Sequence, residues 1–406
     1  MPPQSGGMEI SMKKILIKGY YGYHNLGDDF ILYSLLKSLD RAAKLEAGVK
    51  EPYQVSVISN GDDYQELFKK FHNISCKIIP ERKFRKLHKR IELMKCDYWI
   101  IGGGGLFPDE NAANFPSLLS SIQFAKKFNA KVCIYGIDIN SINSSENKIV
   151  WKKISQLVDF IIVRNHKSYC LLKELGCTNI KESVDITFGV DTEAETKNVD
   201  SCLKKLHLEQ GKYNLWAIPM PWFPNEYDEK VHGERYKKLL DNLSEIAHNQ
   251  HLKENINVFL PFYYDMDMGL IKDMVEKLKL PYVICDNSKA LTLGEKRALF
   301  RFSNCNICMR FHSVMFSIYN GQAGVFISYS DKTSNVIRMM GLEDYLVEYG
   351  IRNSADFYKE FDLDMQRVNR VMDNIFSDDK KSIEKITSKM KQEAAVAQEE
   401  LIKWLK

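Results

Sequence analysis

The stretch KILIKGYYGYHNLGDDF, residues 14–30, passes from a short apolar run into a glycine-rich turn. The run at 14–18 has the length and composition of a β-strand buried on both faces, and helical spacing of apolar residues continues from Phe30 to Leu39. A strand, a glycine turn and a helix in this order open a βαβ unit, whose strands are parallel. The stretch therefore predicts an α/β fold.

The same alternation recurs along a chain of 406 residues, which exceeds the size that one hydrophobic core usually organises. The first set of strands continues with Gln54–Ser59, Cys96–Ile101, Lys131–Tyr135 and Phe160–Val163. After a polar interval at 193–210, the second set comprises Tyr213–Pro219, Ile256–Pro261, Tyr282–Cys285, Asn304–Met309 and Ala323–Ser328. We therefore predict two Rossmann-like, doubly wound domains that face a cleft, residues 13–205 and 206–376, followed by a helical tail at 377–406.

Composition excludes several classes of protein. A net charge of +4 is too small to indicate nucleic-acid binding, and no apolar run approaches the ~20 residues that span a bilayer. Nine cysteines scattered through apolar stretches, with Cys305 and Cys308 among them, are typical of reduced core thiols in a cytoplasmic protein. Asp265 and Asp267 are interpreted as part of a solvated loop, so no metal is expected. The first dozen residues are left out of the predicted fold.

The turn at residues 19–29 is the first candidate for ligand binding. Gly22 lets the backbone turn tightly and lets a ligand approach it, and the helix that follows offers unpaired N–H groups. Under the alternative interpretation, Asn25 or Asp28 merely caps that helix.

Four consecutive glycines, 102–105, directly follow a predicted strand. Such a run loses much backbone entropy on folding, so it indicates that backbone there meets something closely. It is neither the dinucleotide fingerprint nor a P-loop. We therefore predict that Gly103 and Gly104 present backbone N–H groups to a polar ligand.

Arg310 and His312 lie where a strand ends and helical spacing begins, closed by Gly321. They are two residues apart, so in extended backbone they face the same side. A guanidinium matches carboxylate or phosphate oxygens, and an imidazole can donate a proton near neutral pH. A surface arginine and a helix-capping histidine are the competing interpretation. Lys332, before a helix at Ser334–Met340, would be favoured there by a nearby anion.

These elements, in this order, resemble the polysaccharide pyruvyl transferase family. The resemblance runs from about Lys13 to Gly341 and rests on an ordered set of motifs rather than on one of them. The matching segments are Gly19–Asp29, Gly102–Gly105, Val163-Arg164-Asn165, Asp185-Ile186-Thr187-Phe188, Arg310–His312 and Tyr329–Lys332. Asn165 stands where the family usually has Asp, and Ile186 stands where it has Pro, so the acceptor is the part of the function that the motifs define least.

The resemblance implies a GT-B-like architecture and a cytoplasmic enzyme of polysaccharide or exopolysaccharide biosynthesis. It implies transfer of pyruvate from phosphoenolpyruvate to two hydroxyls of a saccharide as a cyclic ketal, with release of phosphate and no cofactor or metal. The expected catalytic residues are His312 as the acid and Asp28 as the base or as an anchor for an acceptor hydroxyl. The expected substrate-binding residues are Arg310 as the anion clamp, Arg164 and Lys332 as supporting cations, and Gly22, Asn25, Gly103 and Gly104.

Two other functions remain open, namely a glycosyltransferase of the same architecture that uses a nucleotide sugar, and a non-catalytic carbohydrate-binding relative. The basic stretch at 82–90 has two interpretations as well. It is either a solvated helix face or a contact with the anionic inner membrane surface, where a lipid-linked acceptor would reside. The oligomeric state is not predicted.

Overall fold

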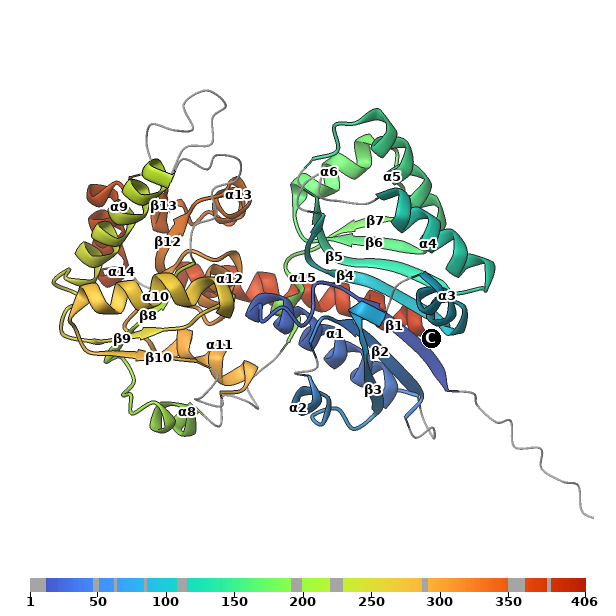
Figure 1. Cartoon of the computed structure of the whole chain (residues 1–406), viewed down its shortest axis with the longest axis horizontal. Coiled ribbons are helices and arrows are strands. Elements are labelled where there is room, and N and C mark those ends of the chain that lie inside the picture. Colours follow the sequence, from blue (N-terminus) through green and yellow to red (C-terminus); the bar gives the residue numbers. More distant parts are fainter. Residues whose placement is uncertain are drawn as a thin grey trace, which may run out of the picture. The chain divides into compact units, whose positions relative to one another are not determined.

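The computed structural model describes residues 12–46, 51–61, 64–83, 86–107, 115–139, 141–190, 199–219, 229–286, 291–349, 362–377 and 381–406 (Figure 1). The chain forms two compact units. Unit 1 comprises residues 1–23, 28–190 and 393–406, and unit 2 comprises residues 24–27 and 191–392. The division falls within two helices, so each of these helices contributes residues to both units.

Unit 1 is built on a seven-stranded sheet in the order β3-β2-β1-β4-β5-β6-β7, and every neighbouring pair is parallel. Its inner strands are apolar and mostly buried on both faces, as parallel sheets require, whereas its two edge strands are partly exposed. The strands are β1 (Lys13–Lys18), β2 (Tyr53–Ser59), β3 (Ile74–Pro80), β4 (Tyr98–Phe107), β5 (Lys131–Ile139), β6 (Phe160–Val163) and β7 (Ile180–Glu182).

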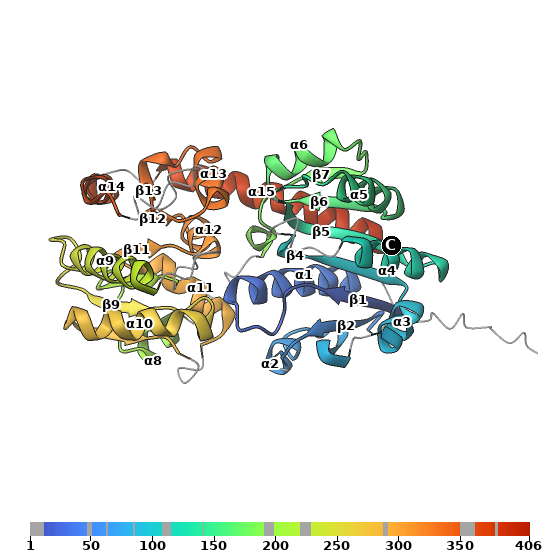
Figure 2. The same cartoon turned by 45° about the horizontal axis from the view of Figure 1, so that its top comes forward.

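Helices pack on the sheet of unit 1, and Figure 2 shows the strands lying among them. They are α1 (Leu26–Lys44), α2 (Gln65–Phe68), α3 (Lys86–Lys95), α4 (Phe115–Lys127), α5 (Ser145–Leu157), α6 (His166–Glu174) and the end of α15 (Lys381–Leu405), with 3-10 turns η1 (Glu81–Lys83) and η2 (Ile186–Gly189). Leu93, Ile122, Trp151 and Leu172 from α3 to α6 share one hydrophobic cluster with alternate strand residues. The end of α15 contacts Tyr98, whose hydroxyl donates to the Leu405 carbonyl at 2.9 Å.

Unit 2 repeats the plan with a six-stranded parallel sheet in the order β10-β9-β8-β11-β12-β13. Its strands are β8 (Tyr213–Ala217), β9 (Ile256–Phe259), β10 (Tyr282–Ile284), β11 (Cys305–Cys308), β12 (Gly324–Ser328) and β13 (Leu346–Glu348). Its helices are α8 (Val199–Lys205), α9 (Glu229–Ala247), α10 (Tyr264–Leu278), α11 (Leu293–Phe302), α12 (Phe311–Tyr319), α13 (Asp331–Met339) and α14 (Met365–Ser377), with the 3-10 turn η4 (Glu343–Tyr345).

Both sheets have the Rossmann strand order, in which the chain first builds outward in one direction and then crosses back to build in the other. The direction reverses between β1 and β4 in unit 1, and between β8 and β11 in unit 2. Ligands of such sheets bind at this switch point, beyond the carboxyl ends of the strands. The glycine turn after β1, the glycines of β4 and Arg310 after β11 all lie at these strand ends. The predicted pair of doubly wound sheets is confirmed.

The structure differs from the predicted strands in two respects. β3, β7 and β13 are not predicted, because β3 carries a lysine and ends in proline, and the other two are three-residue strands that end in glutamate. In addition, β4 does not end before the glycines but runs through them to Phe107. It continues because β5 pairs with it there, Gly102 opposite Tyr135 and Gly104 opposite Ile137.

The compact units also differ from the predicted boundaries of 205/206 and 376/377. The division lies at 190/191, and α8 belongs to unit 2 because it packs on α11, where Lys205 pairs with Glu295 at 2.8 Å. The predicted tail is not a separate region. Residues 393–406 of α15 belong to unit 1, whereas Thr387 lies in unit 2 and donates to the Ile318 carbonyl. The first eleven residues lie outside the described part of the chain.

The cysteine prediction agrees with the structure. All nine cysteines are free thiols, and Cys305 and Cys308 are buried within β11. Burial raises the pKa of Cys305 to about 12, so this thiol is protonated and behaves as a core side chain.

Gly102 provides a stability test of the glycine run. An alanine Cβ there would lie 2.2 Å from the carbonyl oxygen of Tyr135, which cannot move without breaking the β4–β5 pairing. We expect Gly102→Ala to destabilise unit 1 by about 1–3 kcal/mol in urea unfolding, as overpacking does. The matched control is Gly233→Ala within α9, where nothing lies within 4 Å of the new Cβ. It should leave stability unchanged or raise it. Equal effects of both substitutions would contradict this account.

Candidate functional site

In unit 1 the start of α1 lies directly on the glycine segment of β4. A Cβ on Gly103 would be 2.2 Å from Ile31 Cγ2, and a Cβ on Gly104 would be 2.4 Å from a carboxylate oxygen of Asp28. Both glycines have positive φ angles, 96° and 74°. These contacts explain the glycines by close packing of α1 on β4. The prediction that their N–H groups bind a ligand stays a prediction.

Asp28 is 6% exposed and lies at the carboxyl edge of the unit 1 sheet. Tyr21 lies near it and donates its hydroxyl proton to the Gly102 carbonyl at 2.7 Å. Burial, followed by the negative charges of Asp28 and Asp29, raises the pKa of Tyr21 well above its usual value. Tyr21 therefore stays a neutral donor that ties the first turn to β4, and Asp28 is the acidic group at this edge.

Gly22 has internal partners in unit 1. Its φ is 79°, and a Cβ would lie 2.2 Å from the Ser59 hydroxyl at the end of β2. Its N–H donates to the Tyr64 hydroxyl at 2.8 Å, and that hydroxyl in turn donates to Asp29. A ligand would therefore have to displace Tyr64 to reach this N–H group. Substrate binding by Gly22 stays a prediction.

Asn25 lies in the short segment 24–27 that belongs to unit 2. Its side-chain oxygen accepts from the Gly27 N–H at 3.1 Å, and its backbone forms an isolated bridge with Tyr263. The next residue, Leu26, donates its N–H to the Phe262 carbonyl at 2.6 Å. The geometry therefore matches the capping interpretation of Asn25, and it fixes the first residues of α1 on the strand exit of β9.

Arg164, which directly follows β6, is enclosed by carboxylates in unit 1. Its Nη1 lies 2.8 Å from Asp185, and its Nε lies 2.9 Å from Asp138 at the end of β5. All three side chains are at most 2% exposed. Burial lowers the pKa of Arg164, but Asp138, Asp185 and Asp28 raise it further than burial lowers it, so the guanidinium is charged. Its expected role as a supporting cation stays a prediction, because these donors already hold two aspartates.

Two of the positions where the sequence departs from the family pattern also have structural partners in unit 1. Asn165 is the N-cap of α6 and accepts from the Ser168 N–H at 2.8 Å. Ile186 is buried against Gly136, whose φ is 68° and where a Cβ would lie 2.8 Å from the isoleucine side chain. These two departures therefore serve local folding.

Arg310, the N-cap of α12, pairs with Asp267 in unit 2. Burial lowers its pKa, while Tyr329 and Asp267, both hydrogen-bonded to it, raise it more, so it is charged. Its Nε is buried and has no hydrogen-bond partner among the residues that the structure describes. A buried charged N–H without an acceptor is costly, so this atom favours a bound anion.

Asp267 corrects the prediction of a solvated loop at 265–267. It lies in the first turn of α10, is 1% exposed, and accepts from the backbone N–H groups of Phe262 and Tyr263 at 3.1 and 2.9 Å. These bonds and the ion pair with Arg310 satisfy the carboxylate in the interior. In the described residues no group of three or more His, Cys, Asp or Glu side chains is arranged to hold a metal.

His312 lies in the first turn of α12, so the extended backbone assumed for Arg310 and His312 is wrong after the first of them. The imidazole is half-buried and covers Gly27, where a Cβ would come within 1.9 Å of Nδ1. Gly27 is therefore required for the histidine to lie against this backbone. Within unit 2, His312 and Arg310 share the N-terminus of one helix.

Lys332 lies in the first turn of α13, which begins at Asp331 and not at the predicted Ser334. Its Nζ is 4.7 Å from the centroid of the Phe311 ring, so the first turns of α12 and α13 are neighbours. Among the described residues, neither N-cap side chain, Arg310 or Ser330, caps its own helix. Two helix N-termini, an arginine, a histidine and a lysine thus converge in unit 2, an arrangement suited to an anion.

The match to a family model identifies the family of this chain. The model of polysaccharide pyruvyl transferases matches residues 25–331, about three quarters of the chain. The chain belongs to the polysaccharide pyruvyl transferase family. The match begins at Asn25 and ends at Asp331, and it includes Arg310 and His312. No curated protein matches the chain.

Solved structures show the same fold at low sequence identity. An E. coli trehalose-6-phosphate protein bound with UDP-2-fluoro glucose has a TM-score of 0.55 and 10% identity over 97% of this chain and 98% of its own. A UGT transferase from Siraitia grosvenorii in complex with UDP has a TM-score of 0.52 and 8% identity over 96% and 99%. LpCGTa in complex with UDP has a TM-score of 0.53 and 10% identity over 97% of this chain and 99% of its own. The fold is that of the GT-B glycosyltransferases.

The sequence did not single out Asp138, Asp185 or Asp267 as partners of the two arginines. Asp138 has a signal, because it ends an apolar run in a parallel strand, whereas Asp185 comes after the polar segment 181–183. Asp267 does not directly follow an apolar strand in the sequence. It is buried because it lies in the first turn of α10.

Arg164 gives a test of the buried ion cluster. Arg164→Met leaves Asp138 and Asp185 buried without a counter-charge, so we expect a loss of about 3–5 kcal/mol of unfolding free energy in urea. The control is Arg41→Met, in the same unit, where the pair with Glu399 is exposed and worth about 1 kcal/mol or less. A loss at Arg164 no greater than at Arg41 would show that the cluster is not a structural element.

Proposed function

We propose that this transferase moves pyruvate from phosphoenolpyruvate to two hydroxyls of a saccharide, forms a cyclic ketal and releases phosphate. The observation that carries the proposal is the charged Arg310, whose side chain is 21% exposed and whose buried Nε has no partner among the described residues, near His312 in the first turn of α12. Phosphoenolpyruvate carries both a carboxylate and a phosphate, so it needs a site with several fixed cationic or N–H donors.

The site in unit 2 supplies such donors in fixed positions. Asp267 and Tyr329 hold one side of the Arg310 guanidinium, which leaves Nε for an anion. The first turns of α12 and α13 add backbone N–H groups and the positive ends of two helix dipoles. Lys332, beside Phe311, adds a further positive charge. We assign the anion clamp to Arg310 and the supporting cation to Lys332.

The chemistry requires an acid at the methylene carbon of phosphoenolpyruvate. In the proposed sequence, His312 gives its proton to that carbon, and the adjacent carbon becomes an oxocarbenium-like centre. One saccharide hydroxyl attacks it, the bond to phosphate breaks, and the second hydroxyl closes the ring. The two hydroxyl protons restore His312 and leave with the phosphate, so atoms and charge balance.

The acceptor needs a base, and we assign this role to Asp28. It is a buried carboxylate at the carboxyl edge of the unit 1 sheet, beside Gly104. Asp138 and Asp185 are buried too, but they hold the Arg164 guanidinium. We further propose that the acceptor saccharide is linked to a lipid, so that the enzyme works in the cytoplasm at the inner membrane surface. Within the described ranges, none of the helices combines the length and the apolar composition that a membrane span requires.

His312→Ala tests the assignment of the acid. The variant should reduce phosphate release from phosphoenolpyruvate and a saccharide panel by at least about 100-fold, because general acid catalysis contributes that much, while phosphoenolpyruvate binding is largely kept. Phosphate release gives the rate, and calorimetry gives the binding. The control is His248→Ala, which changes an exposed histidine of unit 2 that contacts Ser244. Normal turnover by the His312 variant would place the acid elsewhere.

The mass of the product distinguishes the remaining functions. A gain equal to pyruvate minus one water supports the ketal. Turnover that requires a nucleotide sugar, with thermal stabilisation by uridine or guanosine diphosphate, would support the glycosyltransferase alternative. Saccharide binding without phosphate release, in the wild type, would support a non-catalytic relative.

A further inference from the structure

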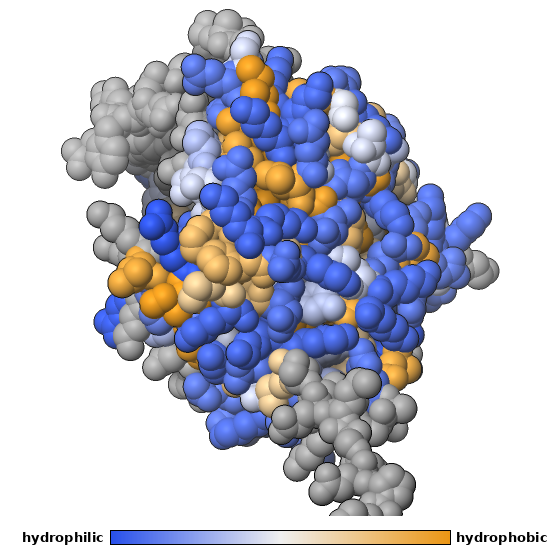
Figure 3. Space-filling view, turned by 90° about the vertical axis from the view of Figure 1, so that its right-hand side faces the viewer, coloured by the Kyte–Doolittle hydropathy of each residue, from blue (hydrophilic) through white to orange (hydrophobic). Residues whose placement is uncertain are grey.

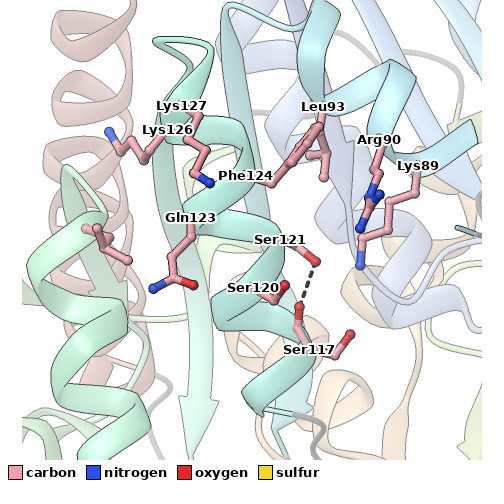
Figure 4. Close-up of a pocket in the computed structure, with 11 residues that line it drawn as sticks. Lys89, Arg90, Leu93, Ser117, Ser120, Ser121, Gln123, Phe124, Lys126 and Lys127 are labelled. Carbon is pink, nitrogen blue, oxygen red and sulfur yellow. Dashed lines mark hydrogen bonds between the residues drawn. The ribbon is translucent and has the colours of Figure 1, made fainter. Parts of the chain in front are cut away.

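The basic stretch predicted at 82–90 ends in a groove of unit 1. The groove has a volume of about 880 Å³ and lies between α3 and α4 (Figure 4). Lys89 and Arg90 line it from α3, and Lys126 and Lys127 line it from α4. Figure 4 shows the two α3 cations on one side and the serines of α4 on the other. The proposed chemistry uses none of these residues.

The cations of the groove are mostly uncompensated. Lys126 pairs with Asp159 at 2.8 Å, but Lys89, Arg90 and Lys127 have no ion pair with a carboxylate within the described ranges. Like charges that share one concave surface repel one another unless an anion lies between them. The groove is therefore arranged for a negatively charged partner.

Lys89 shows this repulsion in its own environment. Burial, followed by the positive charge of Lys18 at the end of β1, lowers the pKa of Lys89. Lys18 directly precedes the turn that leads to Asp28, so the basic groove reaches the carboxyl edge of the unit 1 sheet. An anionic partner in the groove would thus be held near the edge to which we assign the acceptor.

Exposed apolar side chains accompany the groove. Leu87 and Met94 on α3 are 71% and 45% exposed, and their spacing places them on one helix face with Arg90 between them. Phe128, 44% exposed, follows α4, and its ring lies 5.1 Å from that of Phe124. Figure 3, which views the side where α3 and α4 lie in Figure 1, shows small hydrophobic groups among hydrophilic residues. Binding of a small soluble anion does not require exposed apolar side chains nearby, whereas binding to a bilayer surface is strengthened by apolar side chains that enter it.

We propose that the α3–α4 groove, together with Leu87, Met94 and Phe128, docks unit 1 on a bilayer that carries anionic lipid headgroups. The headgroup phosphates would lie among Lys89, Arg90 and Lys127, and the three apolar side chains would enter the interface between headgroups and acyl chains. The inference rests on the proposed function for its purpose, since a lipid-linked acceptor is met at a bilayer. The docking itself needs neither phosphoenolpyruvate nor acceptor.

Sedimentation with vesicles tests the docking directly. Full-length protein should bind vesicles of phosphatidylcholine with about one-third phosphatidylglycerol, should not bind phosphatidylcholine alone, and should be released by high salt. The triple variant Lys89→Gln, Arg90→Gln, Lys127→Gln should bind on the order of 100-fold more weakly, because each cation near an anionic surface contributes about five-fold. The double variant Leu87→Ser, Met94→Ser should also bind more weakly while keeping every charge.

The charge-matched control is Lys237→Gln, Lys253→Gln, Lys272→Gln. It removes three exposed lysines of unit 2, so net charge falls equally, but vesicle binding should stay near the wild-type value. Equal binding to both kinds of vesicle, or equal loss in the control and the groove variant, would overturn the proposal. So would micromolar binding of inorganic phosphate in the groove without vesicle binding, which would assign it to a soluble anion.

Turnover of a water-soluble glycoside acceptor separates this inference from the proposed function. The groove variant should keep wild-type phosphate release with that acceptor, because its substitutions lie on the outer helices. If the wild type releases no phosphate with any acceptor but still binds anionic vesicles, the proposed function fails and the docking stands. If turnover is normal and vesicle binding is absent, the docking alone fails.

Discussion

The reversal of strand order in each sheet is the constraint on which the candidate site depends. Where the chain crosses from β1 to β4, and from β8 to β11, the loops at the carboxyl ends diverge and cannot cover the sheet edge. The glycine turn after β1 and the segment Arg310–His312 after β11 both lie at such an edge. One topological rule therefore explains why motifs separated by about 280 residues of sequence both lie at the switch point of their own sheet, one after its first strand and the other after its fourth.

At these edges the fold uses charge in two different ways. Arg164 is sealed among carboxylates, and the cluster ties the ends of β5, β6 and β7 together at the cost of desolvating every member. Arg310 has a buried partner too, Asp267, but keeps one donor unused. A sequence shows both as an arginine after an apolar strand. The positions of the aspartates distinguish Arg164, which stabilises the fold, from Arg310, which keeps a donor that an anion could accept from.

Periodicity predicted the sheets because a strand buried on both faces has to be continuously apolar. It missed β3 and β13, whose residues are held by neighbouring strands more than by their own pattern. The same limit applies to the site. The glycine run predicted a close approach, and the structure shows two from within the chain: the Tyr135 carbonyl of β5 at Gly102, and helix α1 at Gly103 and Gly104. The start of α12 at Phe311 depends on tertiary contacts, which the spacing of Arg310 and His312 does not contain.

The helix α15 has a consequence for how the protein is made. Its last residues cover Tyr98 in the first sheet, and its earlier residue Thr387 bonds to Ile318 in unit 2. A ribosome synthesises α15 after all the described strands of both sheets, so the first sheet leaves the exit tunnel before this part of its cover exists. During translation neither unit can complete its packing as an independent N-terminal domain would. Until α15 emerges, the nascent chain must keep the uncovered side of that sheet from aggregating.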